Sequence, residues 1–177
     1  MPKFVCRFRA GALAVLLVSG FVAQPVAAQR TALFEGSGDG PEWKEAEFRL
    51  PAYPSSVDLI PLDVRSSTRA QFFIDVRSLS LAEDGVVRYT LVARGAGGAE
   101  NVSFEGVRCA TAERKLYALG RGGEWVPSRN TAWQWIVDNA LNRQHAVLAK
   151  EYFCPPGAAR PSLAEILDLL RKDAGVR

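Results

Sequence analysis

The sequence has little of the chemistry that catalytic and metal sites require. It contains one histidine and three cysteines among 177 residues, whereas a metal site needs several His, Cys or carboxylate ligands that converge. It has no G-x-S-x-G motif, which excludes a serine hydrolase built on that nucleophile elbow. No lysine follows the glycine-rich residues 95–98, so they do not match a phosphate-binding loop. The sequence therefore predicts no metal ion and no cofactor.

A long apolar run is also missing. The apolar residues 10–23 form a run of 14, and a membrane-spanning helix needs about 20. Basic residues precede this run and small residues follow it, at Lys3, Arg7, Arg9, Ala27 and Ala28. These features are typical of a secretory signal peptide. We therefore expect residues 1–28 to be cleaved on export, which leaves no transmembrane segment.

After that cleavage, neither basic nor acidic residues would be in excess. The whole chain has 22 basic and 19 acidic residues, and three of the basic residues belong to the signal peptide. The remaining 149 residues carry 19 of each, so their balance predicts no nucleic-acid partner. Their length is enough for one ordinary core. Cys109 and Cys154 remain for an oxidising compartment, where one disulfide is expected.

What the sequence does contain is a succession of β-rich segments. Residues 85–109 hold two runs of branched and aromatic side chains around a glycine-rich connection, which is typical of a hairpin. Further strands are expected at 71–76 and 114–119. Three prolines place residues 50–62 at an edge of the sheet, because proline cannot donate to a central ladder. The order of strands and turns favours an antiparallel meander.

The last third of the chain changes to helical spacing. Apolar residues recur at that spacing after a cap at Asn130 or Thr131, namely Trp133, Ile136, Val137, Ala140, Leu141, Leu148, Ala149 and Tyr152. Trp133 is expected in the core. Ser162 and Glu165 form a capping box for a final amphipathic helix over 162–174. The expected class is α+β: an antiparallel β-meander of about four to five strands packed by C-terminal helices, with one disulfide.

Four segments of the chain resemble a known family. FFIDVRSLSLAEDGVVRYTLVARG, NVSFEGVRC, ERKLYALG and HAVLAKEYFCP resemble, in order and spacing, the cryptic neisserial protein-like domain of exported proteobacterial proteins. This resemblance implies a Gram-negative cell envelope and hence the periplasm. The family has no established activity, so it supplies no catalytic residues.

The resemblance also sets the expected domain boundaries. It covers residues 43–155, preceded by a flexible leader over 29–42 whose neighbours Trp43 and Phe48 are the anchors. A linker over 156–161 separates this domain from the final helix. That helix lies outside the resemblance, so we expect it to be a satellite.

His145 is the natural candidate for acid–base catalysis because it is the sole histidine. With Glu105 or Glu151 it would give a small envelope hydrolase or transferase. It shares a helical face with Leu141 and Leu148, however, which favours a packed structural role. No nucleophile or cofactor motif supports the enzyme, so this remains the alternative function.

Charged and aromatic residues near the hairpin are the candidates for binding, namely Arg88, Arg108 and Trp135. A four-residue loop over 95–98 would place Arg88 opposite Glu105 as an exposed ion pair. Trp135 lies off the apolar stripe and is expected at the surface. The sequence thus favours a non-catalytic binding or interaction module whose partner is an unidentified envelope protein or polymer.

Overall fold

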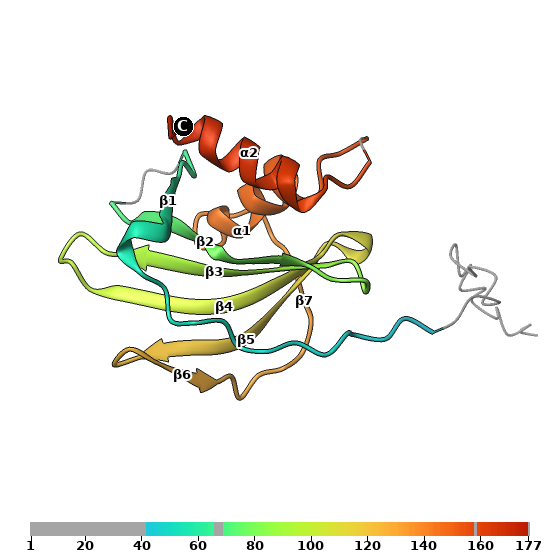
Figure 1. Ribbon diagram of the computed structural model, residues 1–177, viewed down its shortest axis with the longest axis horizontal. Helices are drawn as coiled ribbons and strands as arrows, with labels where there is room; N and C mark the ends of the chain where they lie inside the picture. The colour runs from blue at the N-terminus through green and yellow to red at the C-terminus, as the bar shows by residue number, and fades with distance from the viewer. Residues whose placement is uncertain (1–41, 66–68, 158, 177) are drawn as a thin grey trace, which may run out of the picture. The chain divides into compact units, whose positions relative to one another are not determined.

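One antiparallel sheet organises the part of the chain that the structure describes, which is residues 42–65, 69–157 and 159–176 of a computed structural model. Its strands are β1 (Leu59–Leu62), β2 (Gln71–Leu81), β3 (Val86–Arg94), β4 (Glu100–Arg108), β5 (Glu113–Arg121), β6 (Glu124–Pro127) and β7 (Gln134–Trp135). They lie in the order β1-β2-β3-β4-β5-β6, and β7 also pairs with β5 (Figure 1). The predicted meander is confirmed. It exceeds the expected four to five strands because the short β6 and β7 add to it.

The helical elements are short apart from the last. They are the 3₁₀ turns η1 (Ser56–Asp58) and η2 (Cys109–Thr111), the α-helix α1 (Arg143–Val147), the π-helix η3 (Leu148–Phe153) and the α-helix α2 (Leu163–Asp173). None of the described helices is long and apolar enough to cross a membrane. The predicted signal peptide, residues 1–28, and leader residues 29–41 lie outside the described residues.

Both faces of the sheet are covered. In β3, Val87, Tyr89 and Leu91 belong to the core that includes η3 and α2, and the alternate residues of the strand point to the opposite face. Figure 1 shows α1 and α2 over one face, while the N-terminal segment runs across β4 and β5. Because both faces are covered, Val86 to Val92 are all buried, including Arg88. The described N-terminal residues, from position 42 on, are therefore part of the domain.

The helix predicted over 130–152 is wrong in its first half. Residues 134–135 form β7, and Ile136 N–H donates to Ala112 O at 2.9 Å, so this stretch extends the sheet. The Asn139 side chain then accepts from Leu141 N–H and Asn142 N–H, at 3.0 Å each. Such local bonds offer the backbone an alternative to a helix. Helical structure begins only at Arg143.

The final helix belongs to the core, which corrects its expected role as a satellite. The predicted capping box is present, with Ser162 and Glu165 bonded reciprocally. Ile166 and Leu170 are 0% and 1% exposed and pack in the same cluster as Ile60 and Leu62. The apolar face of α2 is thus docked on the sheet of its own chain.

This docking predicts unequal effects for two neighbouring leucines of α2. Leu170→Ala should lower the free energy of unfolding by about 2–3 kcal/mol, because it empties a filled site. Leu169→Ala is the matched control, since Leu169 is 36% exposed, and it should cost less than about 0.5 kcal/mol. Urea unfolding followed by circular dichroism measures both. Equal small effects would show that the helix contributes little to the core.

The expected disulfide between Cys109 and Cys154 is confirmed. The two Cα atoms lie 5.4 Å apart, and the bond joins η2, directly after β4, to the residue that ends η3. Phe153, next to Cys154, is fully buried, and its ring centroid lies 5.2 Å from that of Tyr89. The bond therefore ties the helical segment to the sheet where the two already pack.

Candidate functional site

The sole histidine lies in a buried polar cluster between the helical segment and the sheet. His145 Nε2 is 2.8 Å from Glu105 Oε2, a contact at ion-pair distance but without directed hydrogen-bond geometry. Tyr89 O–H donates to the same oxygen at 3.1 Å, and Ser103 O–H donates to Glu105 Oε1 at 2.6 Å. The side chains of His145 and Glu105 are only 7% and 5% exposed. The cluster is closed to solvent.

The electrostatics of this cluster favour a permanently ionised carboxylate. Burial raises the pKa of Glu105, but the charge of His145 and the hydrogen bond from Ser103 outweigh it and lower that pKa to about 2. Burial and the Glu105 charge raise the pKa of Tyr89 well above its usual range. A general base works best with a pKa near the operating pH. Glu105 is therefore poorly suited to accept a proton near neutral pH.

The order of the cluster also differs from that of a catalytic triad. In a triad the histidine lies between the nucleophile and the carboxylate. Here Glu105 lies between Ser103 and His145, so the imidazole has no hydroxyl to activate. Glu151, the other predicted carboxylate partner, instead forms an ion pair with Arg65 at the surface. The structure thus joins His145 with Glu105 and separates both from Glu151.

The predicted register of the central hairpin is wrong by one residue. Gly95 N–H donates to Ala99 O, so the loop has five residues and Arg94 pairs with Glu100. Glu105 consequently lies opposite Tyr89, and Arg88 lies opposite Gly106. A slip of one residue moves every side chain to the other face of the sheet. This is why Glu105 reaches His145 and Arg88 does not.

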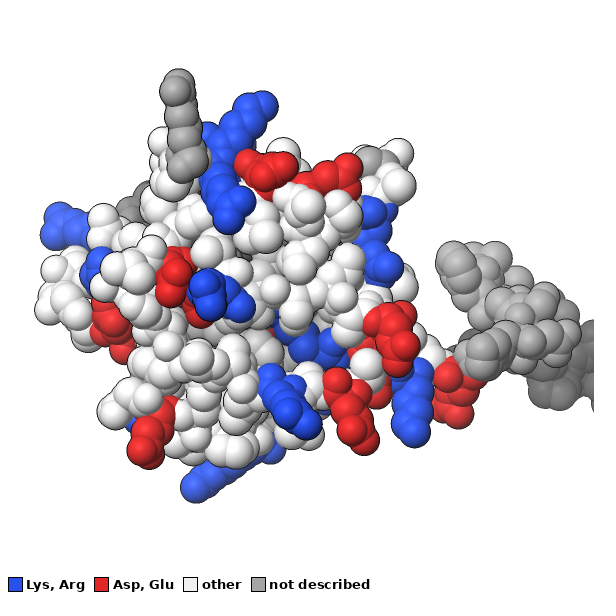
Figure 2. Space-filling view, in the orientation of Figure 1, with Lys and Arg blue, Asp and Glu red and all other residues white. Residues whose placement is uncertain are grey.

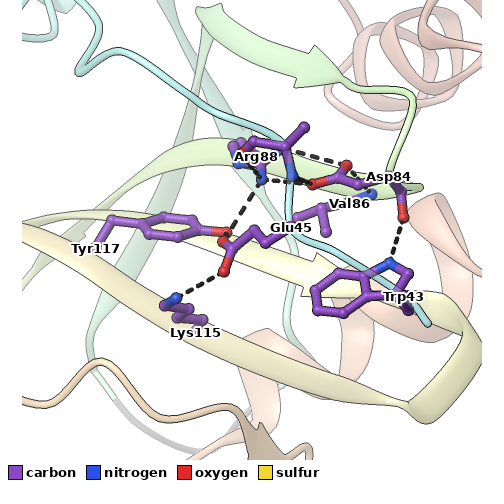
Figure 3. Close-up of polar contacts among 8 residues, drawn as sticks. Trp43, Glu45, Asp84, Val86, Arg88, Lys115 and Tyr117 are labelled. Atoms are coloured by element: carbon purple, nitrogen blue, oxygen red, sulfur yellow. Dashed lines mark hydrogen bonds and ion pairs between the residues drawn. The ribbon is translucent and has the colours of Figure 1, made fainter.

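Arg88 is a buried cation that contacts residues 45–48 of the N-terminal segment. It is 2% exposed, and its Nη2 lies 2.7 Å from Asp84 Oδ2 and 3.5 Å from Glu45 Oε1 (Figure 3). Its Cζ is 5.3 Å from the ring centroid of Phe48 and 5.6 Å from that of Tyr117. The carboxylates compensate the charge of Arg88, and the two aromatic rings cover its guanidinium group. Arg88 is therefore not available as a binding residue.

We call residues 42–53 the strap, because side chains fasten them over the sheet. Trp43 Nε1–H donates to Asp84 O at 2.9 Å, and Asp84 Oδ2 accepts from Ala46 N–H at 2.9 Å (Figure 3). Glu45 accepts from both Lys115 Nζ and Tyr117 O–H at 2.7 Å. Trp43 and Phe48 are anchors, as expected. No sequence periodicity marks Glu45 and Asp84, so sequence reasoning missed the acidic half of this fastening.

The two carboxylates that fasten the strap, Glu45 and Asp84, are held in the ionised form. Burial raises the pKa of Asp84, but the hydrogen bonds from Arg88 and from the Val86 and Ala46 N–H groups lower it below its usual value. For Glu45, the hydrogen bonds from Lys115 and Tyr117 likewise outweigh burial and lower the pKa. The strap is thus fastened by charged groups that stay ionised near neutral pH.

A group of tryptophans with one arginine forms an edge beside the strap. We call Trp43, Trp133, Trp135 and Arg108 the tryptophan edge. The rings of Trp43 and Trp133 meet edge to face at 5.9 Å between centroids, and Arg108 Cζ lies 4.2 Å from the Trp43 centroid. Arg108 Nη2 is 2.8 Å from Glu113, which is the cross-strand partner of Trp135 in β7. Trp133 therefore packs in this edge, and its predicted place in the core is wrong.

Large apolar side chains are exposed at the tryptophan edge and in the segment that follows it in the sequence. Trp135 is 72% exposed, and Val137 and Leu141 in the following segment are 53% and 85% exposed. The structure thus brings two of the three predicted binding residues, Arg108 and Trp135, to one edge. Elsewhere on the face drawn in Figure 2, acidic and basic side chains are interspersed. Within residues 42–65, 69–157 and 159–176, no three His, Cys, Asp or Glu side chains form a group that could hold a metal ion.

The fold and these contacts define an α+β domain with a closed ionic cluster on one face of its sheet and a strap on the other. The chain belongs to the CNP1-like family, whose model matches residues 38–171. It is similar to cryptic neisserial protein 1 of Neisseria gonorrhoeae, with 27% identity over 134 residues. That match covers 66% of each chain, just under two thirds of the relative. No solved structure matches. The resemblance noted from the sequence is confirmed, and the family match extends into α2.

Proposed function

We propose that this protein is a non-catalytic binding module of the periplasm, which binds a protein partner through the tryptophan edge and the segment that follows it. The observation that carries the proposal is the 72% exposure of Trp135 on a backbone fixed by pairing with β5. Protein interfaces are enriched in Trp and Arg, and a few such residues supply most of the binding free energy.

The aliphatic neighbours favour a protein over a polar polymer. Val137 and Leu141 are more than half exposed, and burying apolar area against a partner is favourable. The backbone at Trp135 is ordered by two pairs in β7, so binding orders little additional chain. A protein surface with apolar pockets fits these side chains, whereas a sugar polymer would leave Val137 and Leu141 without complementary contacts.

The closed ionic cluster supports the non-catalytic part of the proposal. Glu105 accepts hydrogen bonds from two hydroxyl groups and lies 2.8 Å from His145, and both side chains are buried. An envelope hydrolase or transferase would need one of them to meet substrate. Glu151, which is accessible, pairs instead with Arg65 at the surface.

Export is the part of the proposal that comes from the sequence alone. If residues 1–28 are a cleaved signal peptide, the mature protein begins at Gln29 and is recovered from the periplasm without detergent. Intact-mass spectrometry of the exported protein measures this directly. A mass that retains Met1, or that carries a lipid, would contradict it. The confirmed disulfide fits an oxidising compartment.

Site-specific photocrosslinking in cells tests the binding surface. A benzophenone amino acid at position 137 should give one discrete protein adduct, and the same probe at position 57 should give none. Val57 is a suitable control because it is 86% exposed and lies in η1. Combining the probe at 137 with Trp135→Ala should remove the adduct, since loss of a central tryptophan weakens binding by about 30-fold. Trp135→Phe should retain most of it.

Each other outcome of that experiment is informative. An adduct that resists protease and is degraded by a glycan hydrolase would replace the protein partner with an envelope polymer. Equal labelling at positions 57 and 137, or no labelling at 137, would overturn the proposed surface. Turnover of an envelope substrate that is lost in a folded His145→Gln variant would favour the enzyme instead.

A further inference from the structure

A surface cavity of about 480 Å³ is lined by the hairpin of β5 and β6 and by the turn after it. Leu119, Val126 and Pro127 supply apolar walls, and Arg121 and Arg129 supply two cations. Leu119 lies opposite Val126 in the sheet, so both point to the same face. Their neighbours Gly120 and Trp125 point to the strap side, where the Trp125 indole donates to Pro51 O. The cavity is therefore on the face opposite the strap.

The charge of the cavity is one-sided. No carboxylate is among the residues that line it. Within the described ranges, neither Arg121 nor Arg129 is in an ion pair, whereas Arg88, Arg94 and Arg108 each pair with an acidic side chain. Each guanidinium presents five N–H donors in a planar fork. Two unpaired forks beside one cavity are suited to an anion with several oxygen atoms.

The backbone that carries the two arginines is fixed without a ligand. Arg121 ends β5 at a tight turn in which Gly122 and Gly123 adopt positive φ of 59° and 85°. Such φ values suit glycine, and they close the two-residue hairpin. On the other side, Ser128 N–H donates to Tyr117 O at 2.8 Å, and its hydroxyl donates to Asn130 O at 2.8 Å. The turn that carries Arg129 is thus tied to β5.

We propose that this cavity binds the phosphate group of an amphipathic ligand. Arg121 and Arg129 would bind the phosphate oxygens, and Leu119 and Val126 would contact the apolar part of the same molecule. A phosphate group matches two unpaired cations better than a carboxylate, which carries a single charge. Glu124 is the cross-strand neighbour of Arg121 and does not line the cavity. Its charge weakens the attraction for the anion.

An NMR titration of the mature protein tests the site with two probes, inorganic phosphate and a short-chain phosphatidic acid below its micelle concentration. Both should give saturable shifts of the amides of Val126, Ser128 and Arg129. Arg121→Gln and Arg129→Gln should each weaken binding about tenfold, and the double variant should abolish it. Glu124→Gln should tighten binding. Arg77→Gln, at an exposed arginine of β2 that does not line the cavity, should leave it unchanged.

The two probes distinguish the sources of the phosphate. Tighter binding of the lipid, with shifts at Leu119, assigns the apolar walls to an acyl chain and supports the proposal in full. Equal affinities would reject the amphipathic ligand. Absence of saturable shifts, or shifts that persist in the folded double arginine variant, would overturn the site. Trp135→Ala should not alter these titrations, so this test is independent of the proposed protein partner.

Discussion

Replacing both Cys109 and Cys154 with serine should lower the free energy of unfolding by about 4 kcal/mol. The bond joins residues 45 apart in sequence, and the chain-entropy model gives a stabilisation of this size for a loop of that length. Domains of ordinary size unfold with 5–15 kcal/mol. The variant should therefore unfold at a much lower urea concentration.

The position of the bond predicts where the variant opens first. Cys154 follows η3, whose residue Phe153 packs on Tyr89, and α1 with η3 is the segment that carries His145. Without the bond, this segment depends on packing and on the ionic cluster alone. Amide exchange should speed up there before it does so in β3 and β4. Wild-type protein treated with reductant is the control and should behave like the double-serine variant.

Thiol alkylation tests whether the disulfide forms in the cell. Protein isolated from cells and denatured without reductant should show neither Cys109 nor Cys154 alkylated. Two labelled cysteines in most molecules would mean that the bond does not form in the cell. An unchanged urea midpoint in the double-serine variant would mean that packing alone already holds the helical segment on the sheet.

The parts of the fold that depend on local pattern could be predicted from the sequence. Residues 71–76 and 86–94 carry branched and aromatic side chains that suit a pleated surface, and glycines mark the turn between β3 and β4. Proline at position 61 marked β1 as an edge strand, and it pairs only with β2. The disulfide could be predicted because the expected cleavage of residues 1–28 would leave two cysteines for one bond.

The parts that depend on distant contacts could not be predicted. Residues 133–141 have helical spacing, but pairing of β7 with β5 and the turn at Asn139 outweigh that local preference. The strap is fastened by Glu45 and Asp84, which bond to residues about 40 to 70 positions away. Such pairs leave no periodic signal in a single sequence. The match to the family describes these segments but not their contacts.

The candidate site was predicted in part for a similar reason. His145 and Glu105 could be named, because each is a rare or charged residue in an apolar context. The residues that contact them could not be named from the sequence. The loop has five residues instead of the expected four, and this difference decides which side of β4 faces the helices. Tyr89 and Ser103 could therefore be assigned to the cluster only once the register was observed.

Glu105→Gln should lower the free energy of unfolding at neutral pH by about 2–3 kcal/mol, because it removes a buried acceptor and leaves its partners poorly satisfied. The carboxylate accepts hydrogen bonds from Tyr89 and Ser103. It also faces the buried Nε2 atom of His145. Glu100→Gln, on the same strand, is the matched control. Its ion pair with Arg94 is at the surface, so its loss should cost less than about 1 kcal/mol.

The pH dependence of stability provides an independent test of the same pair. The pKa of Glu105 in the folded protein, about 2, is below the ordinary value of 4.5. Its contribution is therefore fully present above about pH 4.5 and is lost as the pH falls towards 2, a loss of about 3 kcal/mol. The stability difference between wild type and Glu105→Gln should shrink over that interval, measured by urea unfolding at a series of pH values.

A double-mutant cycle separates a structural pair from a catalytic one. If His145 and Glu105 stabilise each other, Glu105→Gln combined with His145→Gln should cost less than the sum of the single variants, because residues in contact do not contribute additively. The combined variant should then retain partner crosslinking at position 137. Additive costs would show that the two groups do not interact, although Nε2 and Oε2 lie 2.8 Å apart. A stable double variant that had lost a measured turnover would assign the pair to catalysis, because stability and activity would then have separated.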